Sequence, residues 1–585
     1  MSHSFNSRRG RGLAALTSVA GLALTTATIV GSPAAQSAPP AEDCKAAFPV
    51  ADLVKGDAVS ALSVTSGTAP DTFTGTVLGV LDDGIAPDLD MVMVEMDAPS
   101  PDKIGGIWQG MSGSPVYAAD GRLIGAVAYG LSWGPSWVAG VTPFEDMDEY
   151  LNASRPASIK VTDAQARTIA RHSDVTQAQA AEGFSQLKMP LGVSGVGSTR
   201  LAKAERKAGA HSWIPKNTYA TGKAAAPGAG ATEETVVAGG NLAASLSYGD
   251  ITQGGVGTAT SVCGGKVVGF GHPMTFLGET TLSLHPADAI YIQPESLGAP
   301  FKVANLGAPV GTITDDHLTG ITGNFGALPD TTDITSSVTF GTRSRTGTSH
   351  VSVSEANAST TFYQLISNND RVLDSYTKGS GLLSWTINGH QDDGTPFSFS
   401  VSDRYASDYD ISFESSFDLA DFVWSLSNIP GVNIDDVSAT SELNKDNSVY
   451  RVSKIQQKVA GEWVTLDRKH PAVAKAGSQL NLRAVLDSAT GDKTVPLSVS
   501  VPDSAAGSRG RLEVLGGLYT WSRNQYPNTL GQAQKYIDTY VRNDQVQVSL
   551  DLFSRKADKE ISKVNTTDAQ DKVVAGRKAV RVKIM

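Results

Sequence analysis

The pattern of apolar and polar positions has the short period of β-strands over residues 46–151. Four apolar runs carry this pattern: residues 73–81, 91–96, 123–129 and 137–141. The sequences Asp82-Asp83-Gly84 and Ala119-Asp120-Gly121 mark tight turns between such runs. We therefore predict an all-β segment, residues 39–155, that ends in a short helix at 143–151.

A different pattern follows in residues 156–234. Alanine, glutamine, lysine and arginine dominate its first part, where residues 163–172 and 176–187 have helical spacing of apolar positions. Residues 216–232 are rich in alanine, glycine and proline, which is typical of an exposed linker. The pattern predicts a helical insert followed by a linker, and we expect no catalytic residues there.

Strand patterning returns in residues 235–330 and predicts a second small β-barrel that ends near Gly326. Residues 331–435 are predicted as an accessory β region and residues 436–585 as a C-terminal β-rich module. Within these two regions we expect strands at 334–353 and 360–401, a helix at 417–426, a sandwich-like part at 437–501 and a helix at 530–541. The predicted fold class is mainly β, with two barrels and a C-terminal β-sandwich-like accessory region.

The first 38 residues have the features of a secretory signal. Arg8, Arg9 and Arg11 precede an apolar segment at 13–30, and small residues follow up to Ala38. We expect cleavage between residues 34 and 38, with an uncleaved anchor as the alternative. No later stretch has 18 uninterrupted apolar residues, so we expect a secreted or envelope-associated protein that is not inserted in the membrane.

Net charge and cysteine usage narrow the choice of partners. The formal net charge of −11, with scattered lysine and arginine, argues against nucleic acid or an anionic membrane as the main partner. Cys44 and Cys263 are the two cysteines, and an oxidising compartment favours a disulfide between them over free thiols. Two distant thiols do not make a metal site, so we predict neither a metal nor another cofactor.

The sequence Gly110-Met111-Ser112-Gly113-Ser114-Pro115 is the strongest candidate for chemistry. Its small residues allow a sharp turn that exposes one hydroxyl and points several N–H groups at the same place. Such a turn can form an oxyanion hole beside a nucleophile, here with the backbone of Gly110 and Ser112 as donors. Because a serine hydroxyl is weakly nucleophilic, the hypothesis requires a histidine base and an acid elsewhere in the chain.

His272 is the best candidate base among the nine histidines. It lies between Gly271 and Pro273, directly after the apolar run 267–270, and a side chain at a strand end can be held rigidly while it faces a cleft. The alternative is a structural histidine in a turn.

Ser112 and His272 also belong to a set of motifs that resembles a known family. Residues 106–115 with 121–127, Gly271-His272, and Gly-Thr-Ile-Thr at 311–314 are similar to the motifs of the SpoIVB-type serine peptidase family. That family is related to the chymotrypsin-like double β-barrel proteases. The resemblance covers residues 50–150 and 235–330, and it implies a chymotrypsin-like double barrel assembled from these two segments.

The resemblance also implies roles for individual residues. Ser112 matches the family's nucleophile and His272 its base. The family's acid lies fifteen residues before the nucleophile, which corresponds to Asp97. Asp90 and Asp102 are alternative acids, and a loop-capping role for Asp97 remains open. Ser114 is the competing hydroxyl, with support of the turn as its expected role.

Two departures from the family limit what is transferred. The serine segment here precedes the histidine segment, whereas the sporulation protease has the opposite order, and no PDZ module is recognisable.

The expected function is a secreted serine endopeptidase that cleaves protein or peptide substrates through an acyl-enzyme. The alternatives are a catalytically silent binding or scaffold protein of the cell envelope, and a protein that cleaves only itself, within residues 216–232. The substrate and the oligomeric state are left open.

Overall fold

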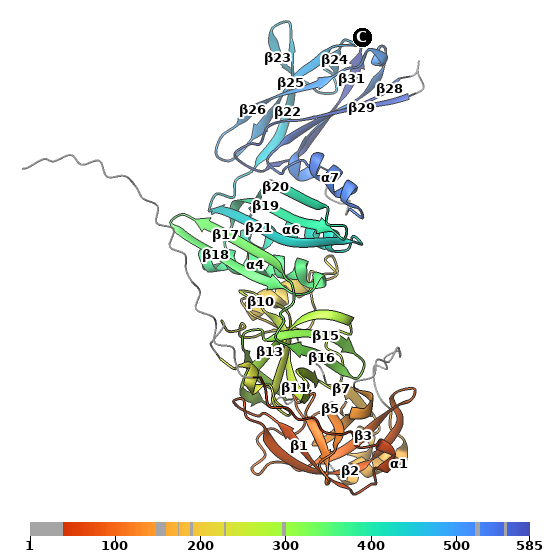
Figure 1. Ribbon diagram of the computed structural model, residues 1–585. Coiled ribbons are helices and arrows are strands. Elements are labelled where there is room, and N and C mark those ends of the chain that lie inside the picture. The colour runs from red at the N-terminus through yellow and green to blue at the C-terminus, as the bar shows by residue number, and fades with distance from the viewer. Residues whose placement is uncertain are drawn as a thin grey trace, which may run out of the picture. The chain divides into compact units, whose positions relative to one another are not determined.

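The computed structural model describes residues 39–147, 160–172, 175–187, 191–226, 230–294, 300–520, 527–554 and 559–585 (Figure 1). The predicted signal segment, residues 1–38, lies outside this range. The last four residues of the predicted helix at 143–151 also lie outside it, and Phe144–Asp146 in its described part form a 3₁₀ turn. The described chain is mainly β, as predicted.

The first β-barrel contains six strands. They are β1 (Ala58–Ser63), β2 (Asp71–Ala86), β3 (Leu89–Met96), β4 (Pro115–Ala118), β5 (Leu123–Leu131) and β6 (Val138–Pro143). Their order is β4-β1-β2-β3-β6-β5, and pairing of β4 with β5 closes the barrel. β5 is buried along its whole length, because one face lines the barrel core and the other is covered by later elements.

The second β-barrel also has six strands. They are β10 (Asn241–Gly249), β11 (Gln253–Cys263), β12 (Lys266–Gly269), β13 (Gly278–Gln293), β15 (Gly311–His317) and β16 (Gly320–Phe325). Pairing of β10 with β11 closes it, and β14 (Phe301–Leu306) adds to β13. Both barrels were expected from the strand pattern, and β16 ends at the predicted limit.

Residues 156–234 contain helices where the sequence predicted them, and also short strands that were not predicted. The described residues of this segment form the helices α1 (Asp163–Arg171), α2 (Gln177–Ala180) and α3 (Ser198–Glu205). Three short strands lie between and after them: β7 (Phe184–Gln186), β8 (Leu191–Val193) and β9 (Thr218–Ala220), and they extend the barrel sheets. The predicted helix at 176–187 ends early because Phe184 is buried against the first barrel, where β7 pairs with β5.

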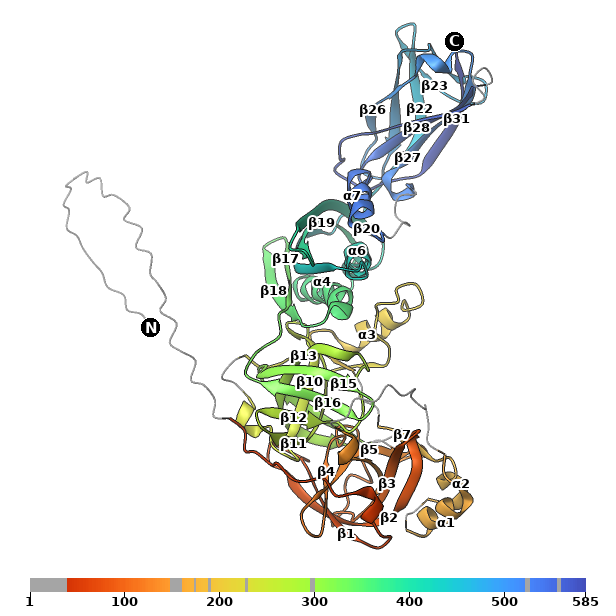
Figure 2. The same ribbon diagram turned by 45° about the vertical axis from the view of Figure 1, so that its right-hand side comes forward.

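The third region combines a sheet with helices. The sheet order is β20 (Pro396–Ser407), β19 (Gly379–Gln391), β21 (Val432–Asn444), β17 (Thr332–Phe340) and β18 (Arg343–Val351). The helices are α4 (Asn357–Leu373), α5 (Ile411–Glu414) and α6 (Phe417–Ser427), and α4 and α6 pack on each other and on the sheet (Figure 2).

The strands predicted over 360–401 are therefore wrong in the first third of that range, where α4 lies. The sequence of α4 is rich in Ser, Thr and Asn, which have weak helix propensity. Tertiary contacts outweigh this, because α4 is buried on nearly all sides and its polar groups bond neighbouring strands. Asn368 Nδ2, for example, donates to the Ser336 carbonyl of β17 at 2.8 Å.

The C-terminal module contains two five-stranded sheets whose inward side chains form one hydrophobic cluster. The first sheet contains β22 (Tyr450–Val459), β23 (Glu462–Thr465), β25 (Gln479–Asp487), β26 (Lys493–Ser500) and β30 (Val574–Ala575). The second contains β24 (Ala472–Ala474), β27 (Arg509–Gly516), β28 (Val546–Ser554), β29 (Lys559–Thr566) and β31 (Arg577–Ile584). α7 (Leu530–Asp538) matches the predicted helix at 530–541. The module begins at β22 and not at residue 436, because β21 pairs with β17 and β19.

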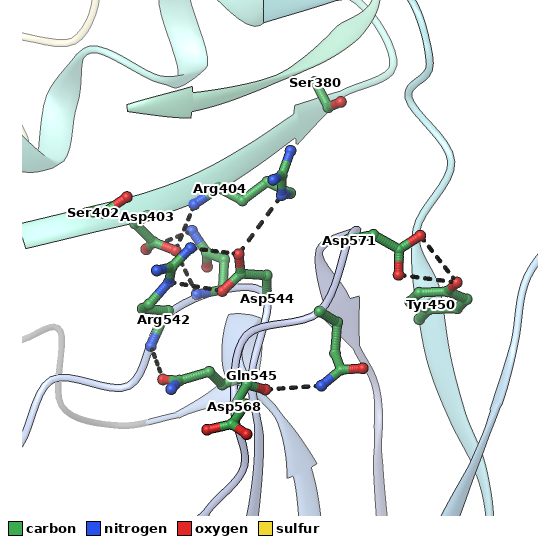
Figure 3. Close-up of polar contacts among 12 residues, drawn as sticks. Ser380, Ser402, Asp403, Arg404, Tyr450, Arg542, Asp544, Gln545, Asp568 and Asp571 are labelled. Carbon is green, nitrogen blue, oxygen red and sulfur yellow. Dashed lines mark hydrogen bonds and ion pairs between the residues drawn. The ribbon is translucent and has the colours of Figure 1, made fainter. Parts of the chain in front are cut away.

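Buried polar contacts join the C-terminal module to the third region (Figure 3). Asp403 of β20 accepts hydrogen bonds from the Asn543 backbone N–H at 2.6 Å and from the Tyr540 hydroxyl at 2.6 Å. Arg404 lies 3.6 Å from the Asp544 carboxylate, which also binds Arg542. Asp403 and Asp544 are both buried, so these contacts hold the two parts of the chain together.

Candidate active site

The serine turn is held in shape by two glycines with positive φ and two buried apolar side chains. Gly110 has φ +93° and Gly113 has φ +95°, a region that glycine enters without strain. Trp108 and Met111 are fully buried in the first barrel and anchor the turn. A Cβ on Gly113 would lie 1.9 Å from the Thr258 carbonyl oxygen, so this position has no room for a side chain.

The turn is bonded to β11 of the second barrel. The Thr258 N–H donates to the Ser112 carbonyl at 2.8 Å, and the Thr258 hydroxyl donates to the Gly110 carbonyl at 3.1 Å. The Thr260 hydroxyl donates to the Gly113 carbonyl at 2.8 Å. The serine turn belongs to the first barrel by sequence, yet it is positioned by the second.

A tight turn after β12 places His272 against the first barrel. Phe270 has φ +69° and is followed by Gly271 with φ +66°. A positive φ at a bulky residue costs about 1–3 kcal/mol and is found most often at functional sites. The Thr142 hydroxyl of β6 donates to the Gly271 carbonyl at 2.7 Å and fixes the turn.

The structure brings the predicted nucleophile and base together. Ser112 Oγ lies 2.8 Å from His272 Nε2, although the two residues are 160 positions apart. His272 Nδ1 lies 2.8 Å from the Pro273 carbonyl oxygen. Because a carbonyl only accepts, Nδ1 carries a proton, and in the neutral ring Nε2 is left to accept from the serine hydroxyl. This is the tautomer that a general base requires.

Asp97 does not join this pair, in contrast to the prediction. It is exposed and directly follows β3, whose last residue, Met96, bonds the Trp137 carbonyl just before β6 begins. The histidine turn contacts β6 near its other end, at Thr142. Five residues of strand separate the two places by about 16 Å, too far for a carboxylate to orient the histidine. The family's spacing fails because it counts along the chain, whereas the histidine comes from a different segment.

The two alternative acids are also occupied elsewhere. Asp102 accepts from the N–H groups of Ile104 and Gly105 at 2.9 and 2.8 Å, and from Trp137 Nε1 at 2.8 Å. Asp90 accepts from the Asp83 N–H at 2.8 Å. Both carboxylates cap loops of the first barrel.

The proposed oxyanion donors are not used by other described parts of the chain. The neighbouring N–H groups of Met111, Gly113 and Ser114 all donate to backbone carbonyls. Across the described residues, no acceptor is found for the N–H of Gly110 or of Ser112. Within the described chain, neither of these two N–H groups is therefore engaged in a hydrogen bond. The Ser114 hydroxyl is buried and has no partner within the described range, so this residue supports the turn through its backbone alone.

The second barrel contains another serine–histidine contact, which serves as a comparison. Ser245 Oγ lies 2.8 Å from His285 Nε2, and His285 Nδ1 lies 2.9 Å from the Gly307 carbonyl. Burial lowers the pKa of His285 to about 4. Ser245 stands in the middle of β10, paired with β11 and β13, and not in a glycine turn. A serine–histidine hydrogen bond alone therefore does not define a catalytic site; the glycine turn around Ser112 is the difference.

Lys302 is a residue at the site that sequence reasoning missed. Its backbone N–H donates to the Gln109 carbonyl at 2.9 Å, and its side chain covers Gly110, where a Cβ would lie 2.8 Å from Lys302 Cβ. Its Nζ donates to Asn241 Oδ1 at 2.8 Å. Burial lowers the pKa of Lys302 to about 7. A lysine between Phe301 and Val303 in an apolar strand is the signal that could have revealed it.

The predicted disulfide between Cys44 and Cys263 is confirmed. The adjoining segment contacts both barrels, since the Asp43 N–H donates to the Val262 carbonyl at 2.7 Å and the Phe48 N–H donates to the Leu123 carbonyl at 2.8 Å. The disulfide therefore fastens the start of the described chain across the junction of the two barrels.

The described residues contain neither a metal-binding group nor a membrane-spanning helix. No group of histidine, cysteine, aspartate and glutamate side chains there is arranged to hold a metal ion. No helix in the described ranges has the length and apolar character needed to cross a membrane. No protein-family model, curated protein or solved structure matches this chain.

Proposed function

We propose that this chain is a secreted serine endopeptidase with a chymotrypsin-like double barrel, similar to the SpoIVB-type family. The observation that carries the proposal is the 2.8 Å contact of Ser112 Oγ with His272 Nε2, beside two backbone N–H groups that have no acceptor among the described residues. The combination of hydroxyl, base and donors is what acyl transfer needs.

In the proposed mechanism His272 Nε2 accepts the Ser112 proton while Oγ attacks a peptide carbonyl carbon. The N–H groups of Gly110 and Ser112 hold the resulting oxyanion, and each such donor contributes about 2.7–4 kcal/mol to lowering the barrier. The imidazolium then protonates the leaving amine, and the C–N bond breaks to leave an acyl-enzyme. Water, deprotonated by the same imidazole, hydrolyses the ester and restores Ser112.

A specific observation favours a second candidate function. Ser112 and His272 are both 0% exposed, so a substrate reaches them only if the chain around them moves. A protease fold that stays closed would act as a catalytically silent binding or scaffold protein of the cell envelope. In that case the two-sheet C-terminal module, which we interpret as β-sandwich-like, would contact the partner.

Labelling with a fluorophosphonate distinguishes the two candidates. We expect a phosphonyl adduct on the peptide that contains Ser112, loss of the adduct in Ser112→Ala, and unchanged labelling in Ser245→Ala, which removes the comparison serine. An intact, folded protein that resists labelling under conditions where a known serine protease reacts would favour the silent protein.

Mass spectrometry tests the alternative of self-cleavage. A protein that cleaves itself would show new termini within residues 216–232 in the wild type and none in Ser112→Ala. Identical intact masses in the two proteins would exclude this alternative.

A further inference from the structure

The peptide group between Pro273 and Met274 is hydrogen-bonded to Asp316 through its N–H and to His272 through its carbonyl. Its carbonyl oxygen accepts from His272 Nδ1 at 2.8 Å. Its N–H, from Met274, donates to Asp316 Oδ1 at 2.8 Å. The same amide therefore connects the carboxylate of Asp316 with the imidazole that contacts Ser112.

Asp316 accepts hydrogen bonds at both of its carboxylate oxygens. Besides Met274, the Thr275 N–H and the Thr275 hydroxyl both donate to its Oδ2 at 2.7 Å. These donors engage both carboxylate oxygens, so the buried side chain is hydrogen-bonded on each of them. The side chain is 0% exposed, so little water screens its charge.

We propose that Asp316 is a positioning residue that replaces the usual triad acid by acting through the Pro273–Met274 peptide group. A carboxylate bonded to an amide N–H polarises the amide and makes its carbonyl oxygen a stronger acceptor. That carbonyl holds the Nδ1 proton and stabilises the imidazolium that forms when Ser112 gives up its proton. The inference rests on the proposed function, because it assigns a role within the same site.

The fold explains why this acid comes from so late in the sequence. Asp316 lies on β15, which pairs with β16 and with the first residues of β13, next to the loop that follows His272. Its neighbour Asp315 bonds the Thr314 hydroxyl at 2.6 Å and His317 at 3.4 Å. Asp315 therefore provides a matched control on the same strand.

The test compares Asp316→Asn with Asp315→Asn by two measurements. The first is the rate and pH profile of fluorophosphonate labelling of Ser112. Direct loss of a triad acid costs about 10⁴-fold, and for an acid that acts through an amide we expect a smaller loss, roughly 10- to 100-fold. We also expect the acidic limb of the profile to move to lower pH in Asp316→Asn alone.

The second measurement does not depend on turnover. In Ser112→Ala protein labelled with ¹³C-histidine and ¹⁵N-methionine, NMR follows the titration of the His272 ring and the Met274 amide. We expect His272 to titrate at lower pH when Asp316→Asn is added, and the Met274 amide shift to follow the His272 titration in protein that retains Asp316. If Asp316→Asn fails to fold, the Met274 measurement in protein that retains Asp316 tests the positioning role by itself.

The outcomes separate the two proposals. If the wild type is not labelled but His272 responds to Asp316, the proposed function fails while the positioning role holds. The positioning role is overturned, even if Ser112 is labelled, by any one of three results. These are a His272 titration that is unchanged in Asp316→Asn, a His272 ring that does not titrate, and a Met274 amide shift that stays constant while His272 titrates.

Discussion

At the scale of single residues, a hydrogen bond to one backbone carbonyl sets the chemistry of the candidate site. The contact of His272 Nδ1 with the Pro273 carbonyl at 2.8 Å fixes which ring nitrogen carries the proton. The same arrangement at Ser245 and His285 shows that proteins also use it in a core. Because His272 contacts Ser112 and Asp97 does not contact either residue, replacing His272 and replacing Asp97 should change the reactivity of Ser112 by very different amounts.

We expect His272→Gln to reduce fluorophosphonate labelling of Ser112 by roughly 10³-fold or more, because the base is lost. Asp97→Asn should change the rate by less than about twofold, because Asp97 lies near the other end of β6 and bonds Thr74. Labelling rates of the two variants check this. A large loss in a folded Asp97→Asn variant would restore Asp97 as the acid.

The buried lysine predicts a pH dependence of stability. Burial lowers the folded-state pKa of Lys302 from 10.5 to about 7, and this outweighs its attraction to Asp71. The unfolded chain binds more protons between these values, so the free energy of unfolding rises with pH from about 7 to about 10. The free-energy cost of burying the charged Lys302 ammonium is fully present below about pH 7 and amounts to at most about 5 kcal/mol.

Urea unfolding at pH 6 and pH 9 measures this effect. We expect the wild type to gain stability over this interval relative to Lys302→Met, which has no charge to bury. Parallel pH profiles for the two proteins would show that Lys302 does not titrate in the folded state near neutrality.

At the scale of elements, the residues of the candidate site lie on short turns and not within strands. The serine turn and the turn after β12 both need positive φ values, and both are held by hydroxyl groups of strands from the opposite barrel. The strands supply rigidity, while the turns determine where the reacting groups lie.

A matched pair of glycines tests the serine turn. Gly113→Ala should cost roughly 3 kcal/mol or more, because the new Cβ meets the Thr258 carbonyl at 1.9 Å and φ is +95°. Gly121→Ala has a similar φ of +84° with no atom within 4 Å, so only about 1 kcal/mol is expected. Chemical denaturation checks both values; equal costs would mean that the turn shifts easily to make room.

At the scale of the whole molecule, the two barrels act as one unit at the site. The serine turn is bonded to β11, the histidine turn to β6, and the segment at Cys44 joins both barrels. The third region and the C-terminal module are joined by a separate polar network (Figure 3).

The polar network predicts how the C-terminal module is attached. Asp403→Ala leaves the Asn543 N–H and the Tyr540 hydroxyl without this buried acceptor, at a cost of roughly 3 kcal/mol to the junction. We expect faster proteolysis within residues 445–449. Asp571→Ala is the control, because its contacts with Tyr450 and Lys493 stay within the module. Equal cleavage of the two variants would mean that other contacts hold the junction.

Local sequence determined much of what is observed. Alternating and continuous apolar runs predicted the strands of both barrels, because strands such as β1 bury one face whereas β5 and β6 are buried on both. The glycine turn identified Ser112, and the Gly-His-Pro turn identified His272. These features are encoded within a few neighbouring residues, so they could be seen without a structure.

Tertiary structure decided the rest. Spacing could not locate a carboxylate near His272, because distance along the chain does not say which residue a turn from another barrel will meet. The positions of Asp97 and Asp316 relative to the histidine turn are seen only in three dimensions. Helix α4 was missed because burial outweighs its weak propensity. The burial of Lys302 and of the Ser112–His272 pair is likewise a property of packing, which a single strand or turn does not determine.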